Sequence, residues 1–507
     1  MKMTARIIPI LTIIFLLAGC NDYSSSLPVN SPGGTITATM TVSYLPPTET
    51  SAPVATPSVS PGPESVRSHT PAITATGQAA TPTGSALAYK GYSSFVNAVP
   101  FDGRWVLFSS ISDQLVVNDT NQKMDVFLYD RETGTVRLVS VSSDGSQAND
   151  HSFGESLSPD GRYAAFRSTA NNLVAGDSGQ SEGLFLHDQQ TGQTKKINLP
   201  GVAGVRDVSI AQDGNWLAFI ADAMQNKPGC SWGPEPKINP CSSIYLFDRE
   251  RGNIKQVSID MDGGQANGPS FAPVMTADGR YIAFKSFASN LVKGDEATCP
   301  SGHPDLGCGD IFIFDRVSHT LKKVVALGEP FGVGVGQRTL DISENGNFIV
   351  FQSVDFQSSQ SSIQVFDRDT QKIEQICAIK AEACNGYAPQ ISGDGRWVAF
   401  SNEQVYLYDR NNKQLSIASQ TSDSKKSGDG ISGVILRVEG LEGNLRMSGF
   451  GRWVAFASQA SNLLPDNTKK DTCSDPAMGD YPCYDIFLHN RETGETKWVN
   501  KPIREKR

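Results

Sequence analysis

The sequence has little charge, few cysteines and no long helical repeat. Charged residues make up 19% of its 507 residues, nine residues are cysteine, and the net charge at pH 7 is −9. The absence of heptads excludes a long coiled coil. Since no basic excess is present, the chain lacks the positive surface that nucleic-acid binding needs. An anionic membrane surface also repels an acidic chain, so we expect any membrane attachment to be covalent.

The first twenty residues are typical of a secretion signal. Lys2 and Arg6 form a positive start, and residues 7–17 are almost wholly apolar, which is too short to span a bilayer. Leu17-Ala18-Gly19-Cys20 follows and resembles the lipobox of bacterial lipoproteins. The resemblance implies that residues 1–19 are a signal peptide and that the Cys20 thiol carries the lipid. The alternative is an ordinary signal peptide that ends near a cysteine.

Residues 20–88 have a different composition from the rest of the chain. Serine, threonine and proline make up about half of this stretch, and its large apolar residues follow no period. Such a segment cannot bury enough apolar surface to offset its conformational entropy, so we predict a disordered linker. A flexible coil of this length spans roughly 45 Å. We expect it to hold the body of the protein away from the membrane.

The body, residues 89–501, contains seven copies of a turn followed by a short apolar strand. The first copy is Asp102-Gly103-Arg104-Trp105-Val106-Leu107-Phe108. The others begin at Asp160, Asp213, Asp278, Asn345, Asp394 and Phe450. Asp-Gly and Asn-Gly pairs between apolar runs are typical of hairpin turns, because glycine accepts a positive φ and Asp or Asn tolerates it.

Each copy has a second half, which is an apolar strand that ends in another turn. Residues 125–134 are the first example, and the counterparts are residues 183–192, 243–252, 310–319, 362–371, 404–412 and 485–494. Each copy therefore holds four strands, and four short strands per repeat are typical of a propeller blade. We predict an all-β, seven-bladed propeller of four-stranded antiparallel blades, followed by a C-terminal tail at residues 502–507.

The copies resemble the TolB-type, WD40-like repeat, in which Ser-Pro-Asp-Gly-Arg precedes an aromatic residue. Residues Leu157-Ser158-Pro159-Asp160-Gly161-Arg162-Tyr163 match it residue for residue, and the resemblance covers about residues 94–500. It implies the fold rather than an activity, because this propeller serves binding proteins and enzyme appendages alike. We expect no counterpart of the α/β domain that precedes the propeller in TolB, since the predicted linker occupies its place.

Eight cysteines remain besides Cys20, and they fall in four close pairs. The pairs are Cys230 with Cys241, Cys299 with Cys308, Cys377 with Cys384, and Cys473 with Cys483. An even count with local spacing in an exported chain predicts disulfides. The alternative is a metal site, which needs Cys-x-x-Cys spacing or nearby histidine, and only His303 lies inside a pair. We therefore predict neither a metal nor a cofactor.

These cysteines are expected on one face of the ring, which we call the loop face. Strands alternate in direction, so links between second and third strands and links between blades lie together, opposite the tight turns. The long insertions at residues 220–243, 285–310 and 457–485 are links of this kind. Long loops on a rigid scaffold often carry binding, so Trp232, Tyr481 and Tyr484 are candidate ligand contacts. The alternative is that the disulfides only stabilise long loops.

A search for catalytic motifs finds only weak matches. Gly229-Cys230-Ser231-Trp232-Gly233 fits Gly-x-Ser-x-Gly, but its prolines and paired cysteine do not suit a nucleophile elbow. Asp119, Asn121 and Asp125 are spaced like Ca²⁺ ligands, although hydrogen bonding at a strand end explains them as well. The recurrent Asp-Arg pairs, such as Asp130-Arg131, are interpreted as turns with a local ion pair. We predict no catalytic residues.

The sequence favours a monomeric, membrane-anchored binding module outside the cytoplasm, in the periplasm or at the cell surface. The lipid would sit in the cell membrane or the outer membrane, and the partner would be a protein or a glycan bound at the loop face. The alternative is a glycan-active hydrolase or lyase whose site lies at the propeller axis. A structural spacer in an envelope assembly is a third possibility.

Overall fold

The computed structural model describes residues 94–503, except residues 180, 224–241, 296–308, 330–338, 356–359, 377–385, 422, 424–425, 438–439, 466–471 and 476–478. The chain divides into two units, Met1–Pro82 and Thr83–Arg507, and all described residues belong to the second. In this part of the chain, no helix is long and apolar enough to cross a membrane.

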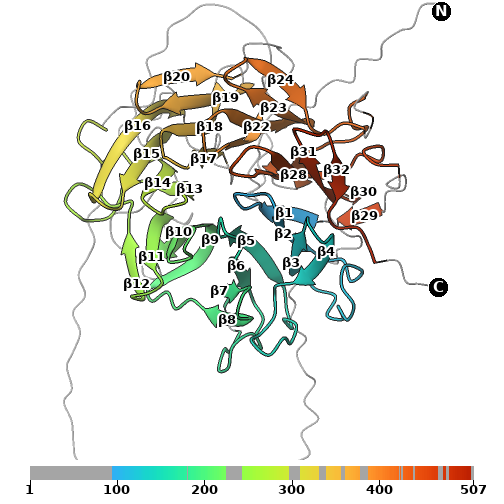
Figure 1. The fold of residues 1–507 in the computed structure, drawn as a ribbon. Coiled ribbons are helices and arrows are strands. Elements are labelled where there is room, and N and C mark those ends of the chain that lie inside the picture. The colour runs from blue at the N-terminus through green and yellow to red at the C-terminus, as the bar shows by residue number, and fades with distance from the viewer. Residues whose placement is uncertain are drawn as a thin grey trace, which may run out of the picture. The chain divides into compact units, whose positions relative to one another are not determined.

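The second unit is an all-β propeller whose described residues form seven four-stranded antiparallel blades in a ring (Figure 1). In every blade the strands follow one another in chain order, which confirms the predicted fold class. The two remaining sheets are hairpins of two strands each, one before the last blade and one within it.

The blades are β1 (Ser94–Ala98), β2 (Trp105–Ser110), β3 (Asp125–Asp130), β4 (Thr135–Leu138); β5 (Ser152–Leu157), β6 (Tyr163–Ser168), β7 (Gly183–Asp188), β8 (Gln193–Lys196); β9 (Val202–Ile210), β10 (Trp216–Ala223), β11 (Ser243–Asp248), β12 (Asn253–Gln256); β13 (Ser270–Met275), β14 (Tyr281–Ser286), β15 (Gly309–Asp315), β16 (Thr320–Glu329); β17 (Leu340–Ile342), β18 (Phe348–Asp355), β19 (Gln360–Asp367), β20 (Lys372–Gln375); β21 (Tyr387–Ile391), β22 (Trp397–Asn402), β23 (Gln404–Asp409), β24 (Gln414–Ile417); and β27 (Leu445–Met447), β28 (Trp453–Ser458), β31 (Asp485–Asn490), β32 (Thr496–Trp498). The hairpins are β25 (Val434–Arg437) with β26 (Gly440–Gly443), and β29 (Thr472–Asp475) with β30 (Gly479–Pro482).

The repeated Asp-Gly turns form as predicted and also join the blades. In the first turn the Arg104 N–H donates to Asp102 Oδ1 over 2.8 Å, and Gly103 takes a φ of +67°. The glycine also leaves room for the neighbouring blade, because a Cβ on Gly161 would lie 2.4 Å from Cδ1 of Trp105. The aromatic residue that follows each turn therefore packs against the next blade's turn and loses exposed surface there. Complete burial of a large side chain contributes about 1.5–3 kcal/mol.

The Asp-Arg pairs form turns, but the ion-pair partner differs from the prediction. Asp130 pairs with Arg104 of its own blade's first turn, at 3.0 Å, rather than with the adjacent Arg131. Arg131 instead lies over the Trp453 ring, with its guanidinium carbon 4.5 Å from the ring centroid, and its Nε donates to the Gly103 carbonyl. The arginine therefore connects neighbouring blades, as do Arg249, Arg316, Arg368, Arg410 and Arg491.

The last blade consists only of residues from the C-terminal end (Figure 1), and hydrogen bonds from both backbone and side chains join it to the first blade. The Val96 N–H of the first blade donates to Asn444 Oδ1 over 2.6 Å, and Asn500 Nδ2 donates to Ser94 Oγ over 3.0 Å. Val96 and Trp453 belong to one hydrophobic cluster that spans both blades. No strand is exchanged between the first and last blades within the described residues.

An axial cavity as the candidate functional site

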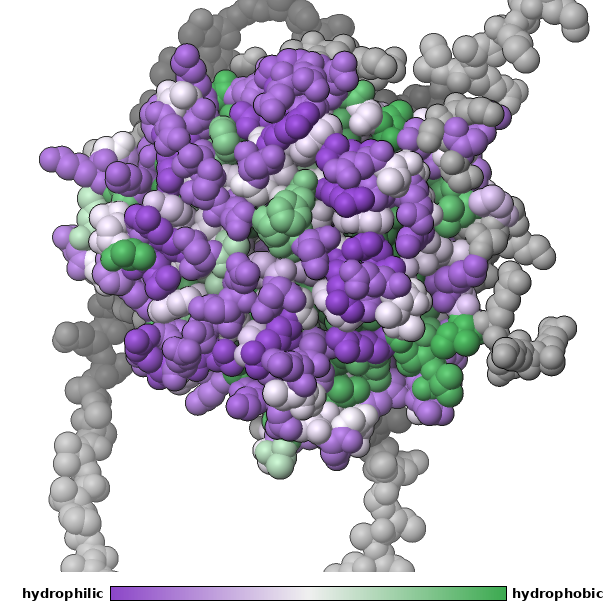
Figure 2. Space-filling model, in the orientation of Figure 1, coloured by the Kyte–Doolittle hydropathy of each residue, from purple (hydrophilic) through white to green (hydrophobic). Residues whose placement is uncertain are grey.

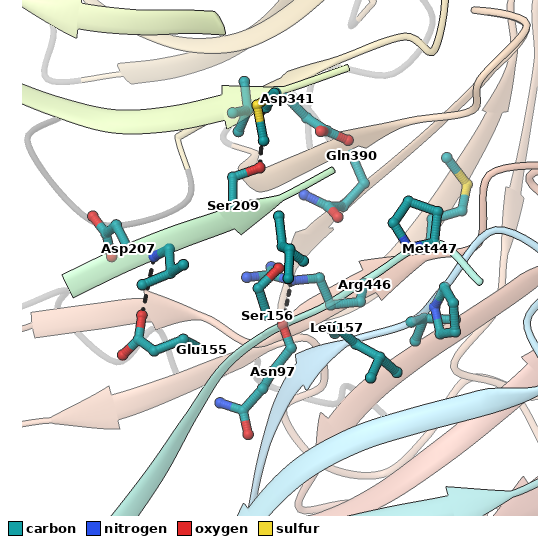
Figure 3. A pocket seen from close by; sticks show the side chains of 18 of the residues that line it. Asn97, Glu155, Ser156, Leu157, Asp207, Ser209, Asp341, Gln390, Arg446 and Met447 are labelled. Atoms are coloured by element: carbon teal, nitrogen blue, oxygen red, sulfur yellow. Dashed lines mark hydrogen bonds between the residues drawn. The ribbon is translucent and has the colours of Figure 1, made fainter. Parts of the chain in front are cut away.

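A cavity of about 540 Å³ lies at the axis, lined by the first strand of every blade or the residues beside it (Figure 3). The residue four positions before the start of each turn motif lines it in all seven blades. These residues, the cavity ring, are Ala98, Ser156, Ser209, Val274, Asp341, Gln390 and Arg446. The same register in every repeat thus brings one side chain per blade to the axis.

Bulges shape the first strands where they line the cavity. Register shifts interrupt the pairing of β1, β5, β9, β13 and β21 with their neighbours. Asp207, Ala272 and Ala388 take positive φ values of 53°, 50° and 51°, which L-residues rarely adopt. Such strain persists where the surrounding structure holds it, and bulges commonly redirect side chains beside functional sites.

Several cavity side chains also connect adjacent blades. Glu155 Oε2 accepts a hydrogen bond from the Val208 N–H over 3.2 Å, and Ser209 Oγ accepts one from the Met275 N–H over 3.1 Å. Asp341 Oδ2 accepts the Ile391 N–H over 2.9 Å, which links the fifth blade to the sixth. These side chains are therefore held in fixed positions, as a preorganised binding site requires.

The electrostatics of the cavity centre on Asp341. This carboxyl group lines the cavity but is surrounded by protein, and burial raises its pKa to about 6. Hydrogen bonds from the Ile391 and Ile342 N–H groups and the charge of Arg446 oppose that rise. On another side, Arg167 pairs with Glu155 and Glu182, and their charges hold its pKa above the ordinary arginine value.

The described lining combines hydrogen-bonding groups with charge. Its ionisable side chains are four carboxylates and two guanidiniums, namely Glu155, Asp207, Asp341, Glu344, Arg167 and Arg446. Among the residues that the structure describes, no group of three or more His, Cys, Asp or Glu side chains could hold a metal ion. A cavity of this size suits a small ligand or the end of a larger one, held by a few convergent polar groups.

The cavity reaches the face that carries the tight turns. Six residues that immediately precede the turn motifs line it: Phe101, Pro159, Ala277, Glu344, Gly393 and Gly449. Backbone hydrogen bonds connect several of these turns, such as Phe101 N–H to the Pro159 carbonyl and Gly393 N–H to the Gly449 carbonyl. We call this edge the mouth. Figure 2 shows one face of the ring, on which hydrophilic residues predominate and apolar ones lie in small separate patches.

The predicted ligand contacts on the loop face have different outcomes. Tyr484 is fully buried and packs with Ala457, so the prediction that it contacts a ligand is wrong. Tyr484 belongs instead to a small hydrophobic cluster with Ala457 and Phe95. Tyr481 lies in β30, opposite Cys473, and its side chain is outside the described structure. Trp232 and the Gly-x-Ser-x-Gly match lie outside the described residues.

Of the nine cysteines, only Cys473 and Cys483 lie among the described residues. Cys483 is disulfide-bonded and buried. Its pairing with Cys473 stays a prediction. Outside the described residues lie the lipidation candidate and the other three pairs: Cys20, Cys230, Cys241, Cys299, Cys308, Cys377 and Cys384.

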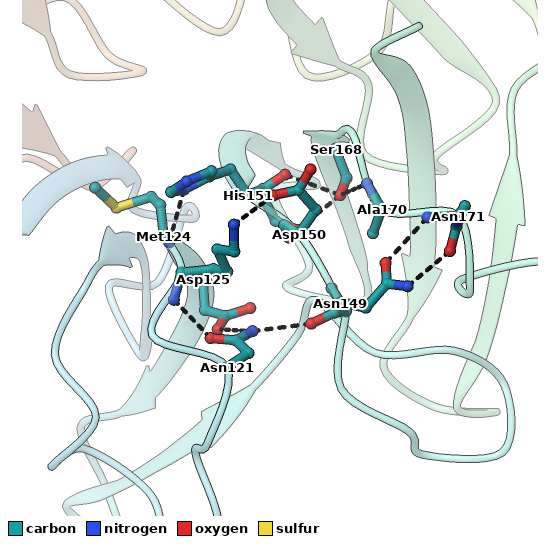
Figure 4. A network of polar contacts seen from close by, with 12 residues as sticks. Asn121, Met124, Asp125, Asn149, Asp150, His151, Ser168, Ala170 and Asn171 are labelled. Atoms are coloured by element: carbon teal, nitrogen blue, oxygen red, sulfur yellow. Dashed lines mark hydrogen bonds and ion pairs between the residues drawn. The ribbon is translucent and has the colours of Figure 1, made fainter. Parts of the chain in front are cut away.

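Asn121 and Asp125 belong to a hydrogen-bond network at the start of β3 (Figure 4), and Asp119 joins this network through Gln147. Asn121 Nδ2 donates to Asp125 Oδ2 over 2.8 Å, and Gln147 Nε2 donates to both aspartates. Burial raises the pKa of Asp125 to about 6, although Ser140 and the two amides partly offset it. The amide nitrogens thus occupy carboxylate oxygens that a cation would need, which fits the interpretation as strand-end hydrogen bonding.

Sequence reasoning missed the cavity ring, although the signal was present. The seven residues differ in type and form no linear motif, so each is inconspicuous alone. In an alignment of the seven repeats on their turn motifs, the cavity-ring residues share one column, four positions before the turn. Their approach to a common axis follows from the inward position of every blade's first strand (Figure 1).

Together these features define the class of the protein, a seven-bladed β-propeller with a polar axial cavity. No family model and no curated protein matches the chain. Among solved structures it is similar to TolB from Acinetobacter baumannii, at 15% identity and a TM-score of 0.36, with 64% of this chain and 62% of that chain covered. The chain thus spans 62% of the length of that TolB structure.

Two further solved structures share the likeness. One is an oligogalacturonate lyase in complex with manganese, at 14% identity and a TM-score of 0.45, with 72% of this chain and 87% of that chain covered. The other is the β-propeller domain of the Trilobed protease from Pyrococcus furiosus, at 11% identity and a TM-score of 0.47, with 81% and 99% covered. These identities bear on the fold alone.

Proposed function

We propose that the chain is a ligand-binding module whose site is the axial cavity, where it binds a polar ligand such as the end of a glycan. The cavity ring carries this proposal, because the same register places Ser156, Ser209, Asp341, Gln390 and Arg446 around one space. Their hydrogen-bonding groups suit hydroxyl and charged groups of a ligand. This proposal moves the site from the loop face, expected from the sequence, to the axis.

The experiment that tests the site blocks the cavity without deleting a hydrogen-bonding group. Ala98 is the smallest member of the cavity ring, so Ala98→Phe inserts a ring into the cavity. Its matched control is Ala175→Phe, since Ala175 is exposed in the link between β6 and β7. The detergent-solubilised full chain and both variants are applied to a glycan array and to envelope extracts. We expect Ala98→Phe alone to lose ligand, and equal retention by Ala98→Phe would contradict the proposal.

A second candidate is a glycan-active hydrolase or lyase at the same site. The observation in its favour is Asp341, whose pKa of about 6 suits a general acid near neutral pH. Both of its carboxylate oxygens, however, accept backbone N–H groups in the described structure. If a retained oligosaccharide is cleaved and Asp341→Asn abolishes cleavage while binding persists, the enzyme interpretation replaces the binding module.

The cellular placement remains a proposal drawn from residues 1–88. We propose that the chain is exported, lipidated on Cys20 and tethered outside the cytoplasm. Metabolic labelling with a palmitate analogue tests this, because a Cys20→Ser variant should lose both the label and the membrane fraction. Labelling that persists in Cys20→Ser would exclude Cys20 as the anchor.

A further inference from the structure

Phe450 departs from the pattern of the other six turns. Those turns begin with Asp or Asn, whose side chain accepts the N–H two residues on, as Asp394 does from Arg396 over 3.0 Å. Phe450 cannot accept such a bond, and 62% of its surface is exposed. A position that breaks a local rule in an otherwise regular repeat is where function is expected.

The ring of Phe450 contacts Phe101, which lines the mouth of the cavity. Their centroids lie 4.3 Å apart at an angle of 64°, so the two rings form one aromatic corner. Gly449 makes the arrangement possible, because a Cβ there would lie 1.8 Å from Cδ2 of Phe101. The corner therefore extends from the cavity onto the tight-turn face.

A carboxylate lies beside this corner. A Cβ on Gly393 would lie 3.0 Å from Cε2 of Phe101 and 3.1 Å from Oε2 of Glu344, so both groups flank the same glycine. Glu344 is exposed at the mouth, and Asp341 lies in the cavity ring of the same blade. An aromatic face next to a carboxylate attracts an organic cation.

The cations of the described lining balance only part of its acidic charge, and Arg446 acts on Asp341 itself. Arg167 forms ion pairs with Glu155 and Glu182. Arg446 donates from Nε to the Asn97 carbonyl and from Nη1 to the Leu445 carbonyl. Since four carboxylates face two guanidiniums in the described lining, the cavity carries net negative charge. Charge complementarity then favours a cationic ligand.

We propose that the ligand is a saccharide with a free ammonium group, which enters the cavity toward Asp341 and Glu344 while its ring packs on Phe101 and Phe450. The hydroxyl groups of the sugar are matched by Ser156, Ser209 and Gln390 in the cavity ring. This inference rests on the proposed function of the axial cavity and specifies its ligand class.

A matched pair of probes tests the charge. The trisaccharide of glucosamine carries three ammonium groups, and its fully N-acetylated form keeps the rings without the charges. Each probe is titrated into the full chain in a calorimeter. We expect the glucosamine form to bind at least tenfold more tightly than the N-acetylated form. Asp341→Asn and Glu344→Gln should each reduce that preference. Glu344→Gln should leave folding undisturbed because Glu344 is exposed.

Phe450→Asn separates the aromatic corner from folding without adding charge at the mouth. It introduces the residue type that begins the turn at Asn345, so thermal stability should be kept or raised, whereas binding of the glucosamine form should fall several-fold. Equal or tighter binding of the N-acetylated form, or no binding of either, overturns the ligand class. If Ala98→Phe still blocks other glycans, the proposed function stands without this inference. If Ala98→Phe blocks no ligand, both fail.

Discussion

Arg446 Nε donates a hydrogen bond to the Asn97 carbonyl over 2.9 Å, which joins the last blade to the first inside the axial cavity. The same guanidinium belongs to the cavity ring, and its charge acts on Asp341. The residues that close the propeller and the residues that line the site are therefore partly the same. Ring closure and site geometry should respond together to substitutions at this junction.

Asn444→Ala should weaken ring closure. The substitution leaves the buried Val96 N–H without the Asn444 Oδ1 acceptor, which costs about 1–3 kcal/mol of unfolding free energy. Urea unfolding measures the loss, and Asn411→Ala is the control because Asn411 is exposed at a turn. A loss no larger than that of the control would show that this bond contributes little to closure.

The arginine–aromatic contacts between blades should be energetically coupled. The Arg491 guanidinium lies 3.7 Å from the Trp397 ring centroid, and its Nε donates to the Gly451 carbonyl. A double-mutant cycle with Arg491→Ala and Trp397→Leu should give a coupling energy of about 1 kcal/mol. Arg452 and Trp453, at 6.0 Å, provide the comparison and should couple more weakly. Additive effects for both pairs would contradict the coupling.

Two buried histidines should make the fold sensitive to acid. Burial lowers the pKa of His187 and of His489 to about 4, from an ordinary value of 6.5. Below pH 6.5 the two histidines bind protons in the unfolded chain but stay neutral in the folded chain. The stability that is present above pH 6.5 is therefore lost as the pH falls toward 4. Each histidine accounts for up to about 3 kcal/mol.

The histidine effect is measured by thermal unfolding from pH 7 to pH 4.5. Replacing both histidines with Asn should flatten the decline relative to the parent chain, whereas the exposed His319→Asn should not. Comparison between variants is needed because Asp125 and Asp341, with raised pKa values, act in the opposite direction. An unchanged slope in the double variant would exclude the two histidines as the cause.

Peptide mapping without reduction should show that Cys483 forms its disulfide with Cys473. Cys473 lies in β29 and Cys483 directly follows β30, the partner strand of the same hairpin. Mass spectrometry should find this link and, by the spacing argument, three other local links. Any link between distant blades would contradict the predicted pairing.

The sequence predicted the fold well because the blade repeat is local. Asp-Gly turns, apolar strands and their spacing are decided within each copy, and the seven turns beginning at Asp102 through Phe450 lie where expected. Burial depends on the whole ring. Tyr484 follows a long insertion and resembles a surface residue in the sequence, yet it is fully enclosed by the core.

The site was harder to predict because it is assembled from all the blades. Asp341 and Arg446 are more than 100 positions apart in the sequence and come together only when the ring closes. The Asp-Arg turns show the same limit. Their local geometry was predicted, but the stacking of Arg131 on Trp453 joins the first and last blades. A local sequence pattern does not predict contacts between the first and last blades.

The most direct test of the axial site is NMR of the full chain labelled with ¹³C in the methionine methyl groups. Met275 and Met447 line the cavity, whereas Met261 is exposed in the link between β12 and β13, on the loop face. On addition of the saccharide that the glycan array selects, the account predicts shifts of the Met275 and Met447 signals and an unchanged Met261 signal. A shift of Met261 alone would place the ligand on the loop face and contradict the axial site.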